Sequence, residues 1–250
     1  MKAFIFAAGL GTRLKPITDT LPKALVPVGG TPLLELLIAK LKRAGFEHVI
    51  INVHHFGDQI MDFVAAHDAF GMDITFSDER NRLLDTGGAL KHARQWIGHD
   101  EPFLIHNVDI LSNVDLRALY QQHLTSAAAA TLVVSERDTQ RYLLFDQQQR
   151  LTGWHNIATG EVKTIYDPQV VLNHQHLAFS GIHMVSPQVI DAMEDWPTVF
   201  PITPFYLQSC KDLCIKGTQV AGLRMMDVGK VASLPQAAAF LKSISSIPDS

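Results

Sequence analysis

The first half of the chain alternates continuous apolar runs with amphipathic stretches. A short apolar run is typical of a strand covered on both faces, whereas apolar residues spaced by three and four indicate a helix. The expected strands are Ala3–Ala8, Val49–Val53, Ile74–Phe76 and Phe103–Asn107, and the expected helices are Pro32–Gly45, Gly57–Ala66 and Gly87–Trp96. Strands that alternate with helices predict a mainly parallel sheet with right-handed crossovers.

The pattern is looser in the second half. Expected strands are Thr131–Val134, Tyr142–Phe145, Leu151–Trp154 and Ile182–Val185, and expected helices are Pro187–Met193, Thr203–Cys214 and a last one that ends at Lys242. The polar segment Ile157–Gln175 is predicted to be a long loop, and long loops in compact domains are often functional. We expect one α/β domain over residues 1–243, with a Rossmann-like mixed sheet, halves that meet near residue 128, and a tail at 244–250.

Composition and charge narrow the function classes. Of 250 residues, 47% are hydrophobic, which is typical of a globular protein. The 21 Lys and Arg against 25 Asp and Glu leave a net charge of −4. This balance lacks the basic footprint of a nucleic-acid-binding protein, so no nucleic-acid partner is expected. An anionic ligand must then be met by a few well-placed cations.

The two cysteines and the apolar runs bear on location. Cys210 and Cys214 cannot form a disulfide framework, and four residues apart on a helix they share a face, so we interpret them as packing residues in a reducing compartment. The N-terminal apolar run is shorter than the hydrophobic region of a signal peptide. No run approaches the roughly 18 apolar residues of a membrane span. The expectation is a cytoplasmic protein without a membrane partner.

A glycine-rich loop, Gly9–Leu14, directly follows the first strand. Glycines let backbone N–H groups approach phosphate oxygens, so the loop predicts a phosphate site. Leu14 stands where the dinucleotide-binding fingerprint needs its third glycine, and the Gly-Lys-Ser/Thr ending of a P-loop is missing. A dehydrogenase and a P-loop NTPase are therefore disfavoured.

The residues after the loop extend the motif. Arg13, Pro16 and Thr18 are followed by Pro22–Val28, which reads PKALVPV. This run resembles the signature GxGTRLxPxT…PKxLxPV of the nucleoside-triphosphate transferases that make nucleotide sugars, and it departs only at Ala24, where a proline is common. Later landmarks of that family recur in order across nearly the whole chain. The resemblance implies a GT-A-like nucleotidyltransferase fold.

The resemblance also implies a reaction. In the family, an oxygen of a sugar 1-phosphate attacks the α-phosphorus of a nucleoside triphosphate, and pyrophosphate leaves. Catalysis then consists of positioning and charge neutralisation. Arg13 would bind the departing phosphates and Lys23 would lie near the α-phosphate, because a guanidinium is a forked donor and an ammonium a point charge. The implied loop contacts to the nucleotide are Ala8, Gly9, Leu10, Gly11 and Thr12.

Two aspartates match the metal-binding landmarks of the family. Asp109 follows the strand Phe103–Asn107, and Asp227 stands in a Met-Asp-Val-Gly segment near the last helix. The resemblance implies that both hold Mg²⁺, which binds few carboxylates and keeps waters and substrate phosphates as its other ligands. The chain departs from the family at Val108, where glycine is usual.

Base recognition is implied by a second glycine-containing segment, Leu84–Ala89. It resembles the second nucleotide loop of the family, which makes Thr86, Gly87 and Gly88 candidates for nucleotide contacts. Glu79 is our candidate for reading the base, because relatives carry a polar residue just before this loop.

Sugar recognition is implied by Ser180 and Gly181, which resemble a Thr/Ser-Gly-Ile element, and by Asn107 at the strand end. Many relatives carry an acid and a lysine in a segment that here reads Leu151–Asn156 and has neither. His155 or Lys163 is the candidate replacement for that lysine.

The Leu-Asp-Thr-Gly-Gly and Ser-Gly-Ile elements are most similar to those of N-acetylmuramate-1-phosphate uridylyltransferases. The expected substrates are therefore UTP and an amino-sugar 1-phosphate such as N-acetylmuramate 1-phosphate. A cytidylyltransferase for phosphocholine or another alcohol phosphate, a mannose-1-phosphate guanylyltransferase, and a non-catalytic nucleotide-sensing module stay open as alternatives. The chain is expected to be a monomer or a homodimer.

Overall fold

The computed structural model describes residues 1–245. These residues form two compact units, each described here by itself. Among the described residues, the first unit comprises Met1–Leu83, His106–Arg117 and residues 223–245, and the second comprises Leu84–Ile105 and Ala118–Gly222. The division differs from halves that meet near residue 128, because the C-terminal segment returns to the first unit.

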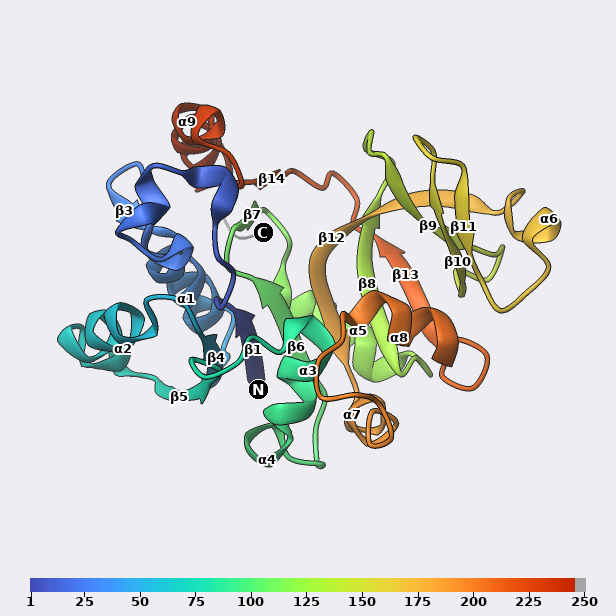
Figure 1. The fold of residues 1–250 in the computed structure, drawn as a ribbon, viewed down its shortest axis with the longest axis horizontal. Helices are drawn as coiled ribbons and strands as arrows, with labels where there is room; N and C mark the ends of the chain where they lie inside the picture. Colours follow the sequence, from blue (N-terminus) through green and yellow to red (C-terminus); the bar gives the residue numbers. More distant parts are fainter. Residues whose placement is uncertain (246–250) are drawn as a thin grey trace. The chain divides into compact units, whose positions relative to one another are not determined.

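Three parallel strands form the centre of the first unit, in the order β1 (Lys2–Phe6), β4 (His48–Val53) and β5 (Asp73–Asp78). The middle residues of β1 and β4 are 0–1% exposed, as expected for strands covered on both faces. Helices α1 (Leu33–Arg43) and α2 (Gly57–Ala66) connect these strands (Figure 1). The leucines and isoleucine of α1 that recur every three or four residues form its buried stripe.

The rest of the first unit consists of short elements and one longer helix. The glycine-rich loop continues through three short 3₁₀ helices, η1 (Thr12–Leu14), η2 (Ile17–Asp19) and η3 (Lys23–Leu25). Strand β7 (Ile110–Ser112) pairs with β14 (Met225–Asp227) in antiparallel orientation. The other elements are β2 (Pro27–Val28), β3 (Thr31–Pro32), η4 (Asp68–Gly71), η5 (Val231–Ser233) and α9 (Leu234–Ser245).

The second unit is organised around the long strand β12 (Gln175–Val185), which pairs in antiparallel orientation with β9 and with β8 (Figure 1). Its other strands are β8 (Ala130–Ser135), β9 (Arg141–Phe145), β10 (Leu151–Asn156), β11 (Glu161–Lys163) and β13 (Ile215–Gln219). Its helices are α3 (Asp85–His92), α4 (Arg94–Ile97), α5 (Leu116–Thr125, of which the first two residues belong to the first unit), α6 (Pro168–Val171), α7 (Pro187–Asp191) and α8 (Ile202–Ser209). Strand β6 (Phe103–Asn107) begins in this unit and ends in the first.

The α/β class is confirmed: the strands form parallel and antiparallel pairs and are flanked by helices. Two local predictions were wrong. The segment Ile157–Gln175 is not one loop, because β11 forms a hairpin with β10 and α6 follows it. The helix around Thr203 ends at Ser209, so Cys210 and Cys214 do not share a helical face, and both are free thiols.

The last described element of the chain is helix α9. Helix α9 extends to Ser245, so the first two residues of the expected tail are helical and residues 246–250 lie outside the described part. Among residues 1–245, no helix is long and apolar enough to cross a bilayer.

Candidate active site

The glycine-rich loop leaves β1 at the carboxyl end of the strand, where parallel α/β sheets bind ligands. Gly11 has φ +64°, and a Cβ there would lie 2.9 Å from Cγ2 of Thr18. The buried Thr18 hydroxyl donates to the Gly11 carbonyl oxygen at 2.8 Å, which closes the loop on itself. Leu10 is 46% exposed, and Thr12 and Arg13 are also exposed. The loop therefore presents its tip to solvent.

The two predicted metal ligands converge in the same unit. Asp109 directly precedes β7, Asp227 is the last residue of β14, and the ladder places Asp227 opposite Ile110. The Val228 N–H donates to the Asp109 carbonyl oxygen at 2.9 Å, so the backbones of the two segments are also joined. Pairing of two three-residue strands thus brings together carboxylates that are 118 residues apart in the sequence.

The electrostatics of this pair fit a divalent cation. Partial burial and the charge of Asp109 raise the pKa of Asp227, while Lys23 and Arg13 act in the opposite direction. The two carboxyl groups lie within hydrogen-bonding reach of each other, and two such groups resist simultaneous ionisation. A hard cation would remove that repulsion, and Mg²⁺ binds few protein carboxylates. No cluster of three or more His, Cys, Asp and Glu side chains suited to a metal occurs in residues 1–245.

Two cations border the carboxylates. The Lys23 ammonium forms an ion pair with Asp109, and both side chains are largely buried. A Cβ on Gly229 would lie 2.5 Å from Oδ1 of Asp227 and 2.9 Å from Nη2 of Arg13, so both groups lie against this one glycine. Arg13, Lys23, Asp109 and Asp227 therefore gather at one place in the first unit.

Glu79 and Asn107, the other predicted site residues of this unit, lie at strand ends. Glu79 directly follows β5, is 2% exposed, and accepts a hydrogen bond from Nδ2 of Asn52 at 2.8 Å. Its side chain is turned into the protein, whereas a residue that reads a base must face the ligand. Asn107 ends β6 and is half-buried, and its carbonyl oxygen accepts from Nδ1 of His106. Burial lowers the pKa of His106 to about 3, so this imidazole is neutral.

The predicted second nucleotide loop lies in the second unit, and residues 198–200 of the same unit pack against its two glycines. The N–H groups of Gly87 and Gly88 both donate to the Phe200 carbonyl oxygen, at 2.8 and 3.1 Å. A Cβ on Gly87 would lie 2.2 Å from the Phe200 ring, and one on Gly88 would lie 2.2 Å from the Thr198 carbonyl oxygen. The Thr86 hydroxyl accepts from the Ile202 N–H. The glycines thus have a structural reason, the close approach of residues 198–200.

The two candidate replacements for the missing lysine lie on opposite faces of a hairpin. Lys163 is opposite Trp154 in the β10–β11 ladder, and His155 is opposite Val162. Cross-strand partners share a face and successive residues alternate, so Lys163 and His155 point to opposite sides. Lys163 lies 5.0 Å from the centre of the Trp154 ring and 3.3 Å from the Glu161 carboxylate. A ligand bound on one face of this hairpin therefore cannot contact both Lys163 and His155.

The His155 ring is hydrogen-bonded to the ring of His176. Nδ1 of His176 donates to the His174 carbonyl oxygen, so Nε2 of a neutral His176 is an acceptor and receives a hydrogen from Nδ1 of His155 at 3.0 Å. The Nε2 atom of His155 is then an acceptor as well. His155 can donate to a phosphate through Nε2 only when its ring carries a second proton.

Ser180 and Gly181 lie within β12. Gly181 has φ +72° at a break in the β8–β12 register, and the buried Ser180 hydroxyl has no hydrogen-bond partner among residues 1–245.

Sequence reasoning missed three residues of the first unit that shape the site: Asn52, Thr18 as a structural residue, and Gly229. Asn52 is 3% exposed, and its Oδ1 accepts from the N–H groups of Ala7 and Ala8 at 2.7 and 3.2 Å. An asparagine inside an apolar strand is costly without partners, and that was the available signal.

Comparisons with known proteins place the chain in a family. Residues 2–244 match the family described as nucleotidyl transferase. The N-acetylmuramate alpha-1-phosphate uridylyltransferase of Neisseria meningitidis is 32% identical over 244 residues, which cover 96% of this chain and 97% of that protein. The protein of the same name from Caulobacter vibrioides is 31% identical and covers 89% of this chain, with 90% of its own length matched.

A solved structure, HddC from Yersinia pseudotuberculosis, shares the fold, with a TM-score of 0.76 and 23% identity over 95% of this chain and 98% of that chain. The fold and the family match cover nearly all of the described residues. The chain therefore belongs to the nucleotidyl transferase family and is an enzyme of that class.

Proposed function

We propose that this enzyme transfers a nucleotidyl group from a nucleoside triphosphate to a sugar 1-phosphate and releases pyrophosphate. The observation that carries the proposal is the gathering of Arg13, Lys23, Asp109 and Asp227 beside an exposed glycine-rich loop in a chain of this family. Both substrates carry phosphate groups with several negative charges, and the site offers two cations and a pair of carboxylates suited to a divalent cation.

Each residue of the site has a role that follows from its side-chain chemistry. The attacking phosphate oxygen is already anionic, so the site needs no general base, and charge neutralisation with alignment is sufficient. The exposed Arg13 guanidinium offers forked donors for the β- and γ-phosphates of the leaving group. Lys23 is held at the carboxylates by Asp109, which fixes its charge near the α-phosphate. The loop backbone from Gly9 to Thr12 binds the triphosphate, and Ala8, whose N–H donates to Asn52, leads the chain into the loop.

We propose Mg²⁺ as the metal, held by Asp109 and Asp227. When bound, it neutralises charge on the triphosphate. The chain contributes the two carboxylates, which Lys23 and the β7–β14 pairing hold in place.

For the substrates, we propose UTP and an amino-sugar 1-phosphate such as N-acetylmuramate 1-phosphate. The support is the likeness to two uridylyltransferases over about nine-tenths or more of each chain and the Ser180–Gly181 element. We assign sugar-phosphate contacts to the face of the hairpin that carries His155 rather than the face of Lys163, because Lys163 is already engaged by Glu161 and Trp154. A cytoplasmic location, and a monomer or homodimer, also stay predictions.

The test is a matrix of nucleoside triphosphates and phosphates, with pyrophosphate release as the readout. UTP, CTP, GTP and dTTP are each combined with N-acetylmuramate 1-phosphate, N-acetylglucosamine 1-phosphate, glucose 1-phosphate, mannose 1-phosphate and phosphocholine. The proposal predicts the highest kcat/KM for UTP with an amino-sugar 1-phosphate. Turnover with CTP and phosphocholine alone would contradict it, and binding of nucleotides without turnover in any combination would favour a nucleotide-sensing module.

A further inference from the structure

The amide orientation of Asn52 is fixed by the residues around it. The N–H groups of Ala7 and Ala8, the last residues before the glycine-rich loop, both point at Oδ1 of Asn52. Two donors require the amide oxygen on that side, so the Nδ2 group must face an acceptor. That acceptor is Oε1 of Glu79, at 2.8 Å. Glu79, Asn52, Ala7 and Ala8 are all at most 4% exposed, so none of these bonds is weakened by solvent.

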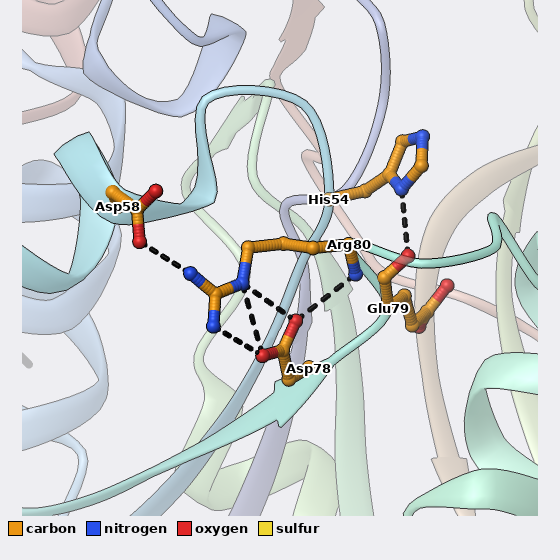
Figure 2. Close-up of polar contacts among 5 residues, drawn as sticks. All are labelled: His54, Asp58, Asp78, Glu79 and Arg80. Atoms are coloured by element: carbon orange, nitrogen blue, oxygen red, sulfur yellow. Dashed lines mark hydrogen bonds and ion pairs between the residues drawn. The ribbon is translucent and has the colours of Figure 1, made fainter.

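Glu79 is in turn anchored through its backbone. Its N–H donates to the Val53 carbonyl oxygen at 2.8 Å, and its carbonyl oxygen accepts from Nδ1 of His54 at 2.7 Å. Figure 2 shows the His54 ring directed at this carbonyl oxygen. The end of β5 is thus attached to the end of β4 on both sides of Glu79.

The residue after Glu79 is clamped as well. The Arg80 guanidinium donates to both carboxylate oxygens of Asp78 and forms an ion pair with Asp58 in the first turn of α2 (Figure 2). The Arg80 N–H also donates to Asp78 at 2.9 Å. A Cβ on Gly57 would lie 3.1 Å from Cδ of Arg80, so the Arg80 side chain lies along the start of α2. These contacts hold the segment from which the Glu79 side chain reaches Asn52.

We propose that Asn52 and Glu79 are positioning residues that fix the start of the glycine-rich loop through the amides of Ala7 and Ala8. Glu79 sets the amide orientation of Asn52, and Asn52 holds the two N–H groups at the point where the chain leaves β1. The loop then leaves the strand in one direction, with Gly11 and Thr18 closing its other end. The kinetic consequence for the nucleotide rests on the proposed function, but the local order of the loop does not.

The test compares Glu79→Met, Glu79→Gln and a matched control, Thr75→Val. Methionine has the length of glutamate but lacks an oxygen acceptor and offers only a weakly accepting sulfur, whereas glutamine keeps the oxygen. Thr75 lies on the same strand and is hydrogen-bonded across the same β4–β5 pair to Nε2 of His48 at 3.2 Å, away from the loop. Each variant is measured by hydrogen exchange of the Ala7 and Ala8 amides without ligand, and by the KM of each substrate.

For Glu79→Met we expect exchange at Ala7 and Ala8 to rise about tenfold, since an opening that costs 1.4 kcal/mol less is ten times more populated. The KM for UTP should rise about tenfold as well, because the loop binds the triphosphate, while the KM for the sugar 1-phosphate stays unchanged. Glu79→Gln should restore both readouts to within about twofold of the native values, and Thr75→Val should leave both unchanged.

Three results would overturn the inference. One is Glu79→Met with native exchange at Ala7 and Ala8. Another is Glu79→Gln with a UTP KM as high as that of Glu79→Met and native exchange, which would mean that the carboxylate itself contacts the nucleotide. The third is Thr75→Val with the same effects as Glu79→Met. Should Glu79→Met fail to fold, Asn52→Ala tests the contact from its other end, with the same expected exchange. Absence of turnover in the native enzyme would refute the proposed function, and the exchange data would still decide the inference.

Discussion

At the scale of single residues, the positions of Asp227 and Arg13 depend on the absence of a side chain at Gly229. Gly229 has no side chain, and the space that a Cβ would need is taken by the ends of the Asp227 and Arg13 side chains. Gly229→Ala should therefore displace both groups while costing under about 1 kcal/mol in the free energy of unfolding, because these side-chain ends can move. We expect kcat/KM to fall at least about tenfold, since small misplacements of catalytic groups are costly. Steady-state kinetics with parallel urea unfolding checks this, and unchanged kinetics would contradict the placement.

The carboxylate pair makes a prediction about metal dependence. Asp227→Asn leaves Asp109 and its ion pair with Lys23 in place but removes one of the two charges that attract a divalent cation. We expect the native enzyme to lose turnover in a chelator and to regain it with Mg²⁺. Asp227→Asn should lower kcat by about 100-fold or more at the same Mg²⁺ concentration, a typical loss for a group that stabilises transition-state charge. Native rates for this variant with and without chelator would show that Asp227 is not a metal ligand.

At the scale of elements, the sequence predicted those with a strong local signal. Strands β1 and β4 are continuous apolar runs because both of their faces are buried, and α1 shows a clear helical stripe. Strands β7 and β14 have three residues each and exist through pairing with each other across more than 100 residues, so no local pattern could reveal that pairing. Strand β11 was missed for a different reason: it pairs locally with β10, but it has only three residues and two of them are charged, so it was taken as part of a long polar loop.

The glycines that begin α3 give a prediction that separates packing from ligand binding. A Cβ on Gly87 would clash with the Phe200 ring, and a smaller side chain at position 200 would relieve that clash. A Cβ on Gly88 would clash with the backbone carbonyl of Thr198, which no side-chain substitution removes. Gly87→Ala and Gly88→Ala should each lower the free energy of unfolding by about 1–3 kcal/mol, the usual cost of overpacking. Adding Phe200→Leu should partly rescue Gly87→Ala and not Gly88→Ala. A double-mutant cycle measured by urea unfolding decides this, and equal rescue of both, or of neither, would contradict the packing account.

Helix α5 gives a prediction about acid stability. His123 is 2% exposed and is hydrogen-bonded to the hydroxyls of Thr131 and Ser186, which ties α5 to β8 and to the end of β12. Burial lowers the pKa of His123 from 6.5 to about 4. The unfolded chain therefore takes up a proton on this ring before the folded one does, and folded stability is lost as the pH falls from about 6.5 to about 4.

A pKa lowered by this amount corresponds to about 3 kcal/mol of stability over that range. His123→Gln, with a neutral amide, should reduce the difference in unfolding free energy between pH 7 and pH 4 by about this amount. His106 contributes with the same sign in both proteins and cancels in the comparison. Urea unfolding of both proteins at the two pH values is the measurement, and an identical pH dependence would refute a neutral buried His123.

At the scale of the whole molecule, the net charge of −4 favours binding of small anions at a few placed cations, and the proposal assigns that role to Arg13 and Lys23. Candidate roles for Arg13 and Lys23 could be predicted from the sequence, because both residues lie in one continuous motif whose residue types indicate phosphate binding. Asn52 could not be assigned a role, since its value lies in contacts to Ala7, Ala8 and Glu79 that only the folded sheet creates. The packing role of Gly87 and Gly88 was not predicted because the local sequence does not show that residues 198–200 approach them, and their nucleotide contacts stay a prediction.

In the proposed reaction, an oxygen of the sugar 1-phosphate attacks the α-phosphorus of the nucleotide. This step is tested most directly with UTP and N-acetylmuramate 1-phosphate whose phosphate oxygens carry ¹⁸O, followed by mass spectrometry of both products. Nucleotidyl transfer predicts that the labelled phosphate is found entirely in the nucleotide sugar and that the released pyrophosphate carries no label. Label in the pyrophosphate, or pyrophosphate release without a nucleotide sugar, would contradict the account.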